Sequence, residues 1–230
     1  MNITHPTALF VLLSMGCAET PFQGTSTGNA IKMGLQPDES GRYVTSSKNG
    51  TEFTVDGASA SVSRISFPLP SLVGCERLGL SAPLSCDASG DGAEIVGDYS
   101  VDLLSGEFSP DLEDLTLPAI KFETIDADVQ TIDVSGTFDY DDTSVAYSLS
   151  ASLPSTLLFT ADGVPKLEDN QAISMLLNPE SWMGAIAVTQ CITDGDLEIT
   201  EGTLEITNDC DNALERIGAA VQDSTVLQID

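Results

Sequence analysis

Histidine is almost absent from this sequence, and its scarcity excludes several kinds of catalysis. The only histidine among the 230 residues is His5, which lies in an N-terminal segment that we expect to be removed. A chain without histidine cannot run a Ser-His-Asp or a Cys-His mechanism, and it lacks the commonest ligand of transition metals. We also find no phosphate-binding loop, dinucleotide-binding glycine pattern or nucleophile elbow. We therefore predict that the protein is not an enzyme.

Basic residues are also few. The chain has 8 lysines and arginines against 36 acids, and its formal net charge is −28. Such a surface repels nucleic acids and anionic lipid headgroups, so we expect no nucleic-acid partner. The simplest interpretation is a solvated acidic surface that keeps an exported protein soluble.

The N-terminal apolar run, residues 8–13, is far shorter than the roughly 20 residues that a transmembrane helix needs. It is followed by Gly16 and Cys17 and then by a polar stretch. This arrangement resembles the export signal of bacterial lipoproteins, in which the cysteine becomes the lipid-modified first residue. The resemblance implies a signal peptide over residues 1–16, lipidation at Cys17 and an anchor in the outer membrane, facing the periplasm or the cell surface. Ala18 after the cysteine favours the outer membrane by the usual sorting pattern.

Two features depart from that signal pattern. Residues 1–16 contain no lysine or arginine, and Ser14 stands where the lipoprotein signal usually has leucine. Either the signal is atypical or the true start lies upstream. The alternative interpretation is a cytosolic protein whose first residues form a buried strand.

The cysteines favour export. If Cys17 is acylated, four remain, and they can pair completely: Cys75, Cys86, Cys191 and Cys210. Four cysteines allow three connectivities. We favour the pairs 75–86 and 191–210, because each pair brackets a short polar loop. Disulfides of this kind are typical of the periplasm or the cell surface. A metal site is the rival interpretation, but the chain has no CxxC spacing to support it.

The rest of the chain predicts one domain behind a tether. Residues 17–50 are rich in threonine, serine and glycine, which is typical of a flexible linker. Residues 51–230 form the predicted domain, and their hydrophobic pattern mostly has a period of two. A change of phase near Ser63 predicts a bulge, and Pro68 predicts an edge position there.

The clearest hairpin prediction lies in the middle of the chain. Apolar residues alternate with small polar ones over residues 132–138 and again over 145–153, and Asp139 to Thr143 separate the two runs. One face is apolar and the other is small and polar, as in an antiparallel sheet with one solvated face. Asn208 or Asp209 can cap a final helix. Together these features predict an all-β fold, an antiparallel β-sandwich of immunoglobulin-like or similar type with a short C-terminal helix.

Calcium is the only cofactor that the sequence suggests, because acidic turns supply the oxygen ligands that it prefers. The main candidates are Asp139, Asp141 and Asp142. The first two match the opening of an EF-hand loop, but the glycine and the final glutamate of that motif are absent. A polar hairpin turn is the alternative interpretation. Weaker candidates for a calcium site are Asp87 with Asp91 and Glu94, and Asp194 with Asp196.

Trp182 is the single tryptophan, and we expect it in the core.

The layout of residues 60–225 resembles uncharacterised β-rich lipoproteins of Gram-negative bacteria. The resemblance lies in residues 60–67, 99–106, 110–111, 115–118, 134–138, 140–141 and 181–182. It implies an exported, lipid-anchored β-sandwich with no assigned activity. We therefore expect a non-enzymatic binding or structural module at the cell envelope, with a protein or glycan partner. The alternatives are a calcium-dependent glycan- or protein-binding domain and a hydrolase with an acidic site.

Overall fold

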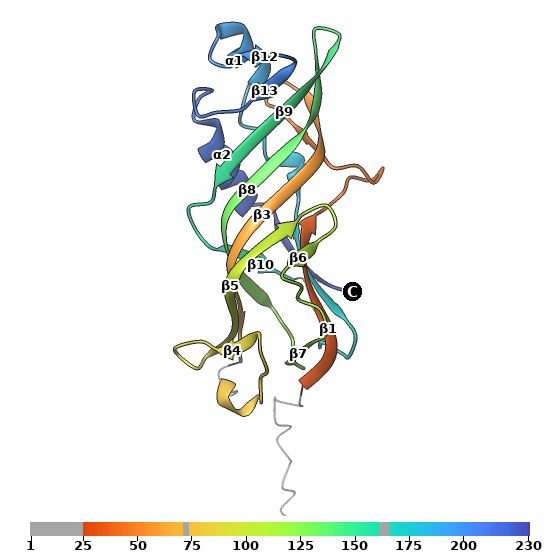
Figure 1. Cartoon of the computed structure of the whole chain (residues 1–230), viewed down its shortest axis with the longest axis vertical. Coiled ribbons are helices and arrows are strands. Elements are labelled where there is room, and N and C mark those ends of the chain that lie inside the picture. The colour runs from red at the N-terminus through yellow and green to blue at the C-terminus, as the bar shows by residue number, and fades with distance from the viewer. Residues whose placement is uncertain (1–24, 71–73, 162–165) are drawn as a thin grey trace, which may run out of the picture.

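The computed structural model describes residues 25–70, 74–161 and 166–230. The predicted signal peptide and Cys17 lie outside these residues. The described chain is elongated (Figure 1), with the start of β1 near one end and the turn between β8 and β9 at the other.

Two β-sheets make up most of the structure. The larger has ten strands in the order β12-β13-β9-β8-β3-β5-β4, with β10, β2 and β6 beside β8, β3 and β5 respectively. Its strands are β2 (Val44–Ser46), β3 (Glu52–Pro68), β4 (Leu84–Cys86), β5 (Gly92–Asp102), β6 (Glu107–Ser109), β8 (Thr124–Tyr140), β9 (Thr143–Ser152), β10 (Leu157–Thr160), β12 (Ile199–Thr200) and β13 (Thr203–Glu205). The smaller has the order β14-β11-β1-β7, formed by β14 (Thr225–Ile229), β11 (Ala172–Leu177), β1 (Thr25–Leu35) and β7 (Leu115–Pro118).

The predicted sandwich is confirmed, but its strands are not all antiparallel. β1 runs parallel to β11, and β13 runs parallel to β9. The two sheets are joined along both sides. On one side the backbone N–H of Leu35 donates to the carbonyl of Leu103 (2.7 Å), and on the other the hydroxyl of Thr225 donates to the carbonyl of Leu158 (2.6 Å). Apolar side chains of both sheets fill the space between them.

The central hairpin forms as predicted. β8 and β9 pair antiparallel from Thr131 with Ser152 to Tyr140 with Thr143. The predicted bulge is also present, as a register shift between Val62 and Arg64 on β3. The alternation of buried and exposed residues along these strands follows the sequence pattern closely, because a period of two places successive side chains on opposite faces.

Pro68 is the last residue of β3. The strand as a whole lies between β5 and β8 in the larger sheet, but its pairing with β8 ends at Ser66, and Pro68 pairs only with Gly92 of β5. The predicted edge position at this end of the strand is therefore confirmed, and a proline is tolerated there because one side of the strand has no partner among the described strands.

The predicted tether is wrong over most of its length. Residues 25–35 form β1, which lies between β11 and β7, and Val44–Ser46 pair with β3.

The strand β1 buries Met33 and the polar Asn29 completely. The amide Nδ2 of Asn29 donates to the carbonyls of Glu168 (2.8 Å) and Gln171 (3.1 Å). The folded domain therefore includes residue 25, and only residues 17–24 of the predicted tether lie outside the described part.

Short helices lie beside the larger sheet and contribute buried side chains to the core. They are η2 (Pro179–Ser181), α1 (Val188–Asp194) and α2 (Ala213–Gln222). A further short helix, η1 (Cys75–Arg77), lies near β4. Trp182 is buried in the core as predicted, and its Nε1 donates to Ser224 Oγ (3.0 Å). The predicted C-terminal helix is present. It begins at Ala213, and Asn208 Oδ1 accepts from the backbone N–H of Leu214 (2.9 Å).

Candidate functional site

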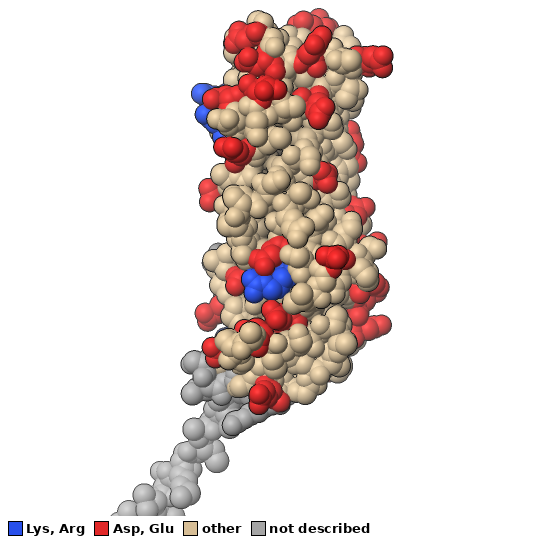
Figure 2. All heavy atoms as spheres, turned by 60° about the vertical axis from the view of Figure 1, so that its left-hand side comes forward, with Lys and Arg blue, Asp and Glu red and all other residues tan. Residues whose placement is uncertain are grey.

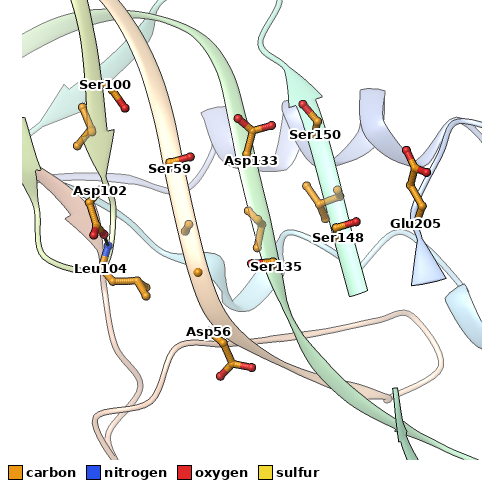
Figure 3. A pocket seen from close by; sticks show the side chains of 15 residues that line it. Asp56, Ser59, Ser100, Asp102, Leu104, Asp133, Ser135, Ser148, Ser150 and Glu205 are labelled. Atoms are coloured by element: carbon orange, nitrogen blue, oxygen red, sulfur yellow. Dashed lines mark hydrogen bonds between the residues drawn. The ribbon is translucent and has the colours of Figure 1, made fainter. Parts of the chain in front are cut away.

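A shallow groove of about 600 Å³ lies on the outer, solvent-facing side of the larger sheet. It crosses β5, β3, β8, β9 and β13 (Figure 3). The residues that line it are Asp56, Gly57, Ala58, Ser59, Ser100, Val101, Asp102, Leu104, Asp133, Val134, Ser135, Ser148, Leu149, Ser150 and Glu205. The groove is therefore built from the small polar face of the sheet that the hairpin pattern predicts.

The strand register arranges the polar side chains of the groove in rows. Asp102 of β5 pairs with Ser59 of β3, which pairs with Asp133 of β8, which pairs with Ser150 of β9. Figure 3 shows these four side chains following one another across the sheet.

The next row runs from Gly57 through Ser135 and Ser148 to Glu205. The first row alternates carboxylates with hydroxyls, whereas the second places two neighbouring serine hydroxyls between Gly57 and Glu205. Every side chain in the two rows is short except that of Glu205.

Small residues keep the groove open. A Cβ at Gly57 would lie 2.8 Å from Ser135 Oγ, so a side chain there would fill space between the two strands. The residues that line the groove include no aromatic ring, histidine, cysteine, lysine or arginine. Its hydroxyls therefore have no neighbouring base of the kind that activates a serine nucleophile. The chemistry that this lining offers is hydrogen bonding and attraction of positive charge.

The groove carries four carboxylates, on Asp56, Asp102, Asp133 and Glu205. Within the described residues none of the four forms an ion pair, whereas Arg42, Arg64 and Arg216 each contact carboxylates elsewhere. Acidic side chains are also spread over the surface and gather at the end formed by the β8–β9 turn (Figure 2). The groove is thus one acidic region of a strongly acidic molecule.

Asp102 also accepts hydrogen bonds from the turn that follows β5. Its Oδ1 accepts from the backbone N–H groups of Leu104 (2.9 Å) and Ser105 (3.2 Å), which fixes the turn after β5. The carboxylate therefore stays at the rim of the groove in a defined orientation.

A buried tyrosine lies on the core side of the same sheet. Tyr147 is 2% exposed, and its hydroxyl has no hydrogen-bond partner among the described residues. Burial raises the pKa of Tyr147, and the negative charge of Asp56 raises it further. Tyr147 does not line the groove.

A second polar cluster lies on the larger sheet around Arg64. Its Nε donates to Asp128 Oδ2 (2.8 Å), and its Nη1 lies 3.9 Å from Glu94 Oε2. The hydrogen bond from Arg64 lowers the pKa of Asp128, whereas burial raises the pKa of neighbouring Asp126. A hydrolase with an acidic site needs two carboxylates with separated pKa values, but the hydrogen bond from Arg64 to Asp128 and the burial of Asp126 account for the separation without catalysis.

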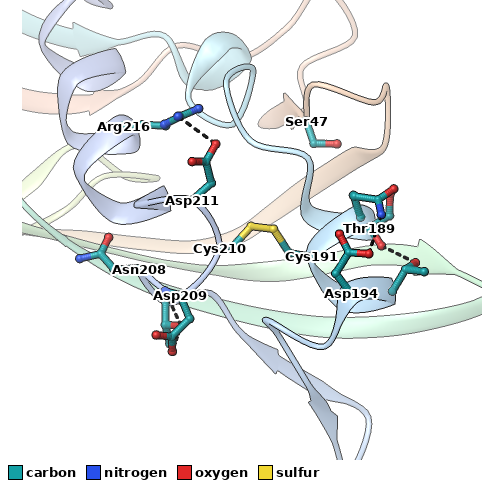
Figure 4. The surroundings of a disulfide bond; sticks show 12 residues. Ser47, Thr189, Cys191, Asp194, Asn208, Asp209, Cys210, Asp211 and Arg216 are labelled. Atoms are coloured by element: carbon teal, nitrogen blue, oxygen red, sulfur yellow. Dashed lines mark hydrogen bonds and ion pairs between the residues drawn. A yellow bond between two sulfur atoms is a disulfide. The ribbon is translucent and has the colours of Figure 1, made fainter.

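The four cysteines pair as predicted. Cys75 bonds to Cys86 and Cys191 bonds to Cys210, with Cα–Cα distances of 5.7 and 5.6 Å. The second disulfide joins the helix α1 to the loop before α2 (Figure 4). All four described cysteines are thus in disulfides, and the fifth cysteine of the sequence, Cys17, lies outside the described residues.

The main calcium candidates lie at the β8–β9 turn. Asp141 and Asp142 are its two central residues and have φ values of 49° and 59°. A two-residue hairpin turn with positive φ at both positions favours aspartate, asparagine and glycine. Asp139 lies on β8 opposite Ser144. The turn conformation therefore accounts for Asp141 and Asp142 without calcium.

The weaker calcium candidates are separate groups. Asp87 Oδ1 accepts from the backbone N–H groups of Ser89, Gly90 and Asp91, so it is used in its own turn, and Asp194 Oδ1 accepts from Gln190. In the described parts of the chain, no group of three or more acidic, cysteine or histidine side chains is arranged to hold a metal ion.

Comparisons with protein-family models, curated proteins and solved structures return no match to this chain. Within the described residues no helix has both the length and the apolar character needed to cross a membrane.

The sequence pattern indicated the polar face of the hairpin. It did not indicate the groove, because Asp56, Asp102 and Glu205 join that face only through strand pairing.

Proposed function

We propose that this protein is an exported, lipid-anchored module of the bacterial cell envelope that binds a partner without catalysing a reaction. In this proposal Cys17 carries the lipid in the outer membrane, and the β-sandwich extends from it into the periplasm or the surroundings of the cell. The groove on the outer face of the larger sheet is the binding surface.

The pairing of the cysteines is the observation that carries this proposal. Cys75, Cys86, Cys191 and Cys210 are all consumed in disulfides, and disulfides persist mainly in oxidising compartments. The one remaining cysteine, Cys17, follows an apolar run and a small residue, as in a lipoprotein signal. Four of the five cysteines pair with one another, and the fifth directly follows an apolar run and a small residue. This arrangement favours lipidation of Cys17 over a free thiol at that position.

The position of the domain start also supports anchoring at Cys17. Only the residues from 18 to 24 separate this cysteine from β1, and a chain of that length spans at most about 25 Å. The start of β1 lies at the opposite end of the molecule from the β8–β9 turn (Figure 1). A lipid at Cys17 would hold the first end close to the membrane and leave the acidic far end away from anionic headgroups, which repel it.

Membrane fractionation tests the proposal. The full-length chain with a C-terminal tag is expressed in a Gram-negative host, and its inner and outer membranes are separated by density. We expect the tagged protein in the outer membrane, and Cys17→Ser in the soluble fraction. As a matched control, Ala18→Asp keeps the cysteine and should move the protein to the inner membrane. Soluble wild-type protein, or membrane retention of Cys17→Ser, would overturn the proposal.

A further inference from the structure

We infer that the groove binds an extended peptide segment of a partner protein that carries lysine or arginine side chains. This inference rests on the proposed function, because it specifies the partner of the proposed binding surface. Three features of the groove carry it: carboxylates that form no ion pair within the described residues, the spacing that the strand register imposes, and the lack of rings in its lining.

The first feature is charge. Asp56, Asp102, Asp133 and Glu205 contribute four carboxylates from β3, β5, β8 and β13, and no basic side chain of the described chain forms an ion pair with them. Because the whole molecule is strongly acidic, its field attracts cations toward this face. A partner with cationic side chains supplies the opposite charge that the groove lacks.

The second feature is spacing. Strands lie about 4.8 Å apart in a sheet, so Asp102 and Asp133, which are separated by the single strand β3, have backbones about 10 Å apart. An extended peptide places side chains of one face about 7 Å apart, and the long stems of lysine and arginine readily span the difference. The serines between the carboxylates can bond the peptide groups of the ligand.

The third feature is what the lining lacks. The groove has no aromatic ring on which a sugar could stack, and its exposed side chains are polar and, apart from Glu205, small. An extended peptide needs neither a ring nor a deep cavity, because it binds through peptide hydrogen bonds and its side chains. These observations favour a peptide over a glycan.

The test measures peptide binding to the oxidised full chain by fluorescence anisotropy at low salt. The probe is a labelled octapeptide of alternating lysine and serine, and the same peptide with acetylated lysines is the uncharged control. The groove variant is Asp133→Asn with Glu205→Gln. The matched variant is Asp139→Asn with Asp141→Asn, which removes the same charge from the β8–β9 hairpin, and asparagine tolerates the positive φ of position 141.

We expect the groove variant to bind the lysine peptide about tenfold more weakly than the wild type, the usual effect of losing two exposed ion pairs. The matched variant should bind within about twofold of the wild type. Equal losses in both variants would mean general attraction to an acidic protein and would overturn the inference. It would also be overturned by equal binding of the acetylated peptide, or by no binding at all. Membrane fractionation does not depend on the groove. A negative result in the peptide-binding test would therefore overturn this inference and leave the test of lipid anchoring at Cys17 unaffected.

Discussion

Replacing Gly136 by alanine is expected to destabilise the protein strongly, because the centre of the larger sheet has no room for a methyl group. Gly136 on β8 pairs with Val55 of β3 and with Tyr147 of β9. A Cβ at this position would overlap the carbonyl oxygen of Thr54 and would lie 3.0 Å from Cε1 of Tyr147. The first contact is with backbone, so no side-chain rotation relieves it. β3 and β8 would have to separate locally.

The size of the effect follows from this geometry. Overpacking a well-filled core costs typically 1–3 kcal/mol, and more where backbone must move, so we expect a loss of about 3 kcal/mol. For a domain of this size that corresponds to a fall in melting temperature of roughly 6–12 °C. Thermal unfolding followed by circular dichroism under oxidising conditions measures it directly.

Gly57→Ala is the matched control for Gly136→Ala. Its new Cβ would lie 2.8 Å from Ser135 Oγ, a hydroxyl at the surface that can rotate away, so we expect a fall of less than about 3 °C. If Gly136→Ala melts as close to the wild type as this control does, the close approach of β3 and β8 is refuted.

Three further predictions concern stability. Cys191→Ala with Cys210→Ala opens a loop of 19 residues and should lower the free energy of unfolding by about 3 kcal/mol in urea titrations; an unchanged midpoint would contradict the stabilising role of this disulfide. Asn29→Ala removes a buried amide that donates to the carbonyls of Glu168 and Gln171 and accepts from the buried hydroxyl of Ser26. It should cost about 2 kcal/mol by the same assay, and a loss below about 0.5 kcal/mol would show that water replaces the amide. Arg64 lowers the pKa of Asp128, so this carboxylate stabilises the fold above its unfolded pKa of about 4 and loses that contribution as the pH falls through the lowered folded value. Thermal melts should therefore show a wild-type advantage over Asp128→Asn near neutral pH that disappears in acid, and a difference that does not vary with pH would contradict the ion pair.

Local sequence signals predicted several elements correctly because their causes are local. The alternation over residues 132–138 and 145–153 gave the β8–β9 hairpin, since a period of two fixes which side chains face the core. The short polar loops between cysteines gave both disulfide pairs. The C-terminal helix was predicted from a capping residue at Asn208 or Asp209. It begins later, at Ala213, and its N-cap residue Asn212 makes no side-chain capping hydrogen bond, although Asn208 Oδ1 accepts from the backbone N–H of Leu214.

The elements that sequence analysis missed depend on distant partners. β1 contains two glycines, a lysine and a buried asparagine, so its composition is typical of a linker. It is a strand because β11 and β7 pair with its two sides, and because Asn29 finds acceptors at Glu168 and Gln171.

The groove was not predictable for the same reason. Ser135 and Ser148 are neighbours through a hairpin that the sequence indicates, but Asp102 and Glu205 reach the same face through the pairing of β5 with β3 and of β13 with β9. A parallel contact such as β13 with β9 leaves no turn signal in the sequence, because its strands are joined by a long connection. Only the assembled register brings the carboxylates together.

The most direct test of the account is the intact mass of the protein purified from the membranes of a Gram-negative host, with alkylation of thiols before reduction. We predict a chain that begins at Cys17 with added acyl mass and takes up no alkylating agent, because the other four cysteines are in disulfides. A chain that keeps residues 1–16 and alkylates at Cys17 would contradict lipid anchoring.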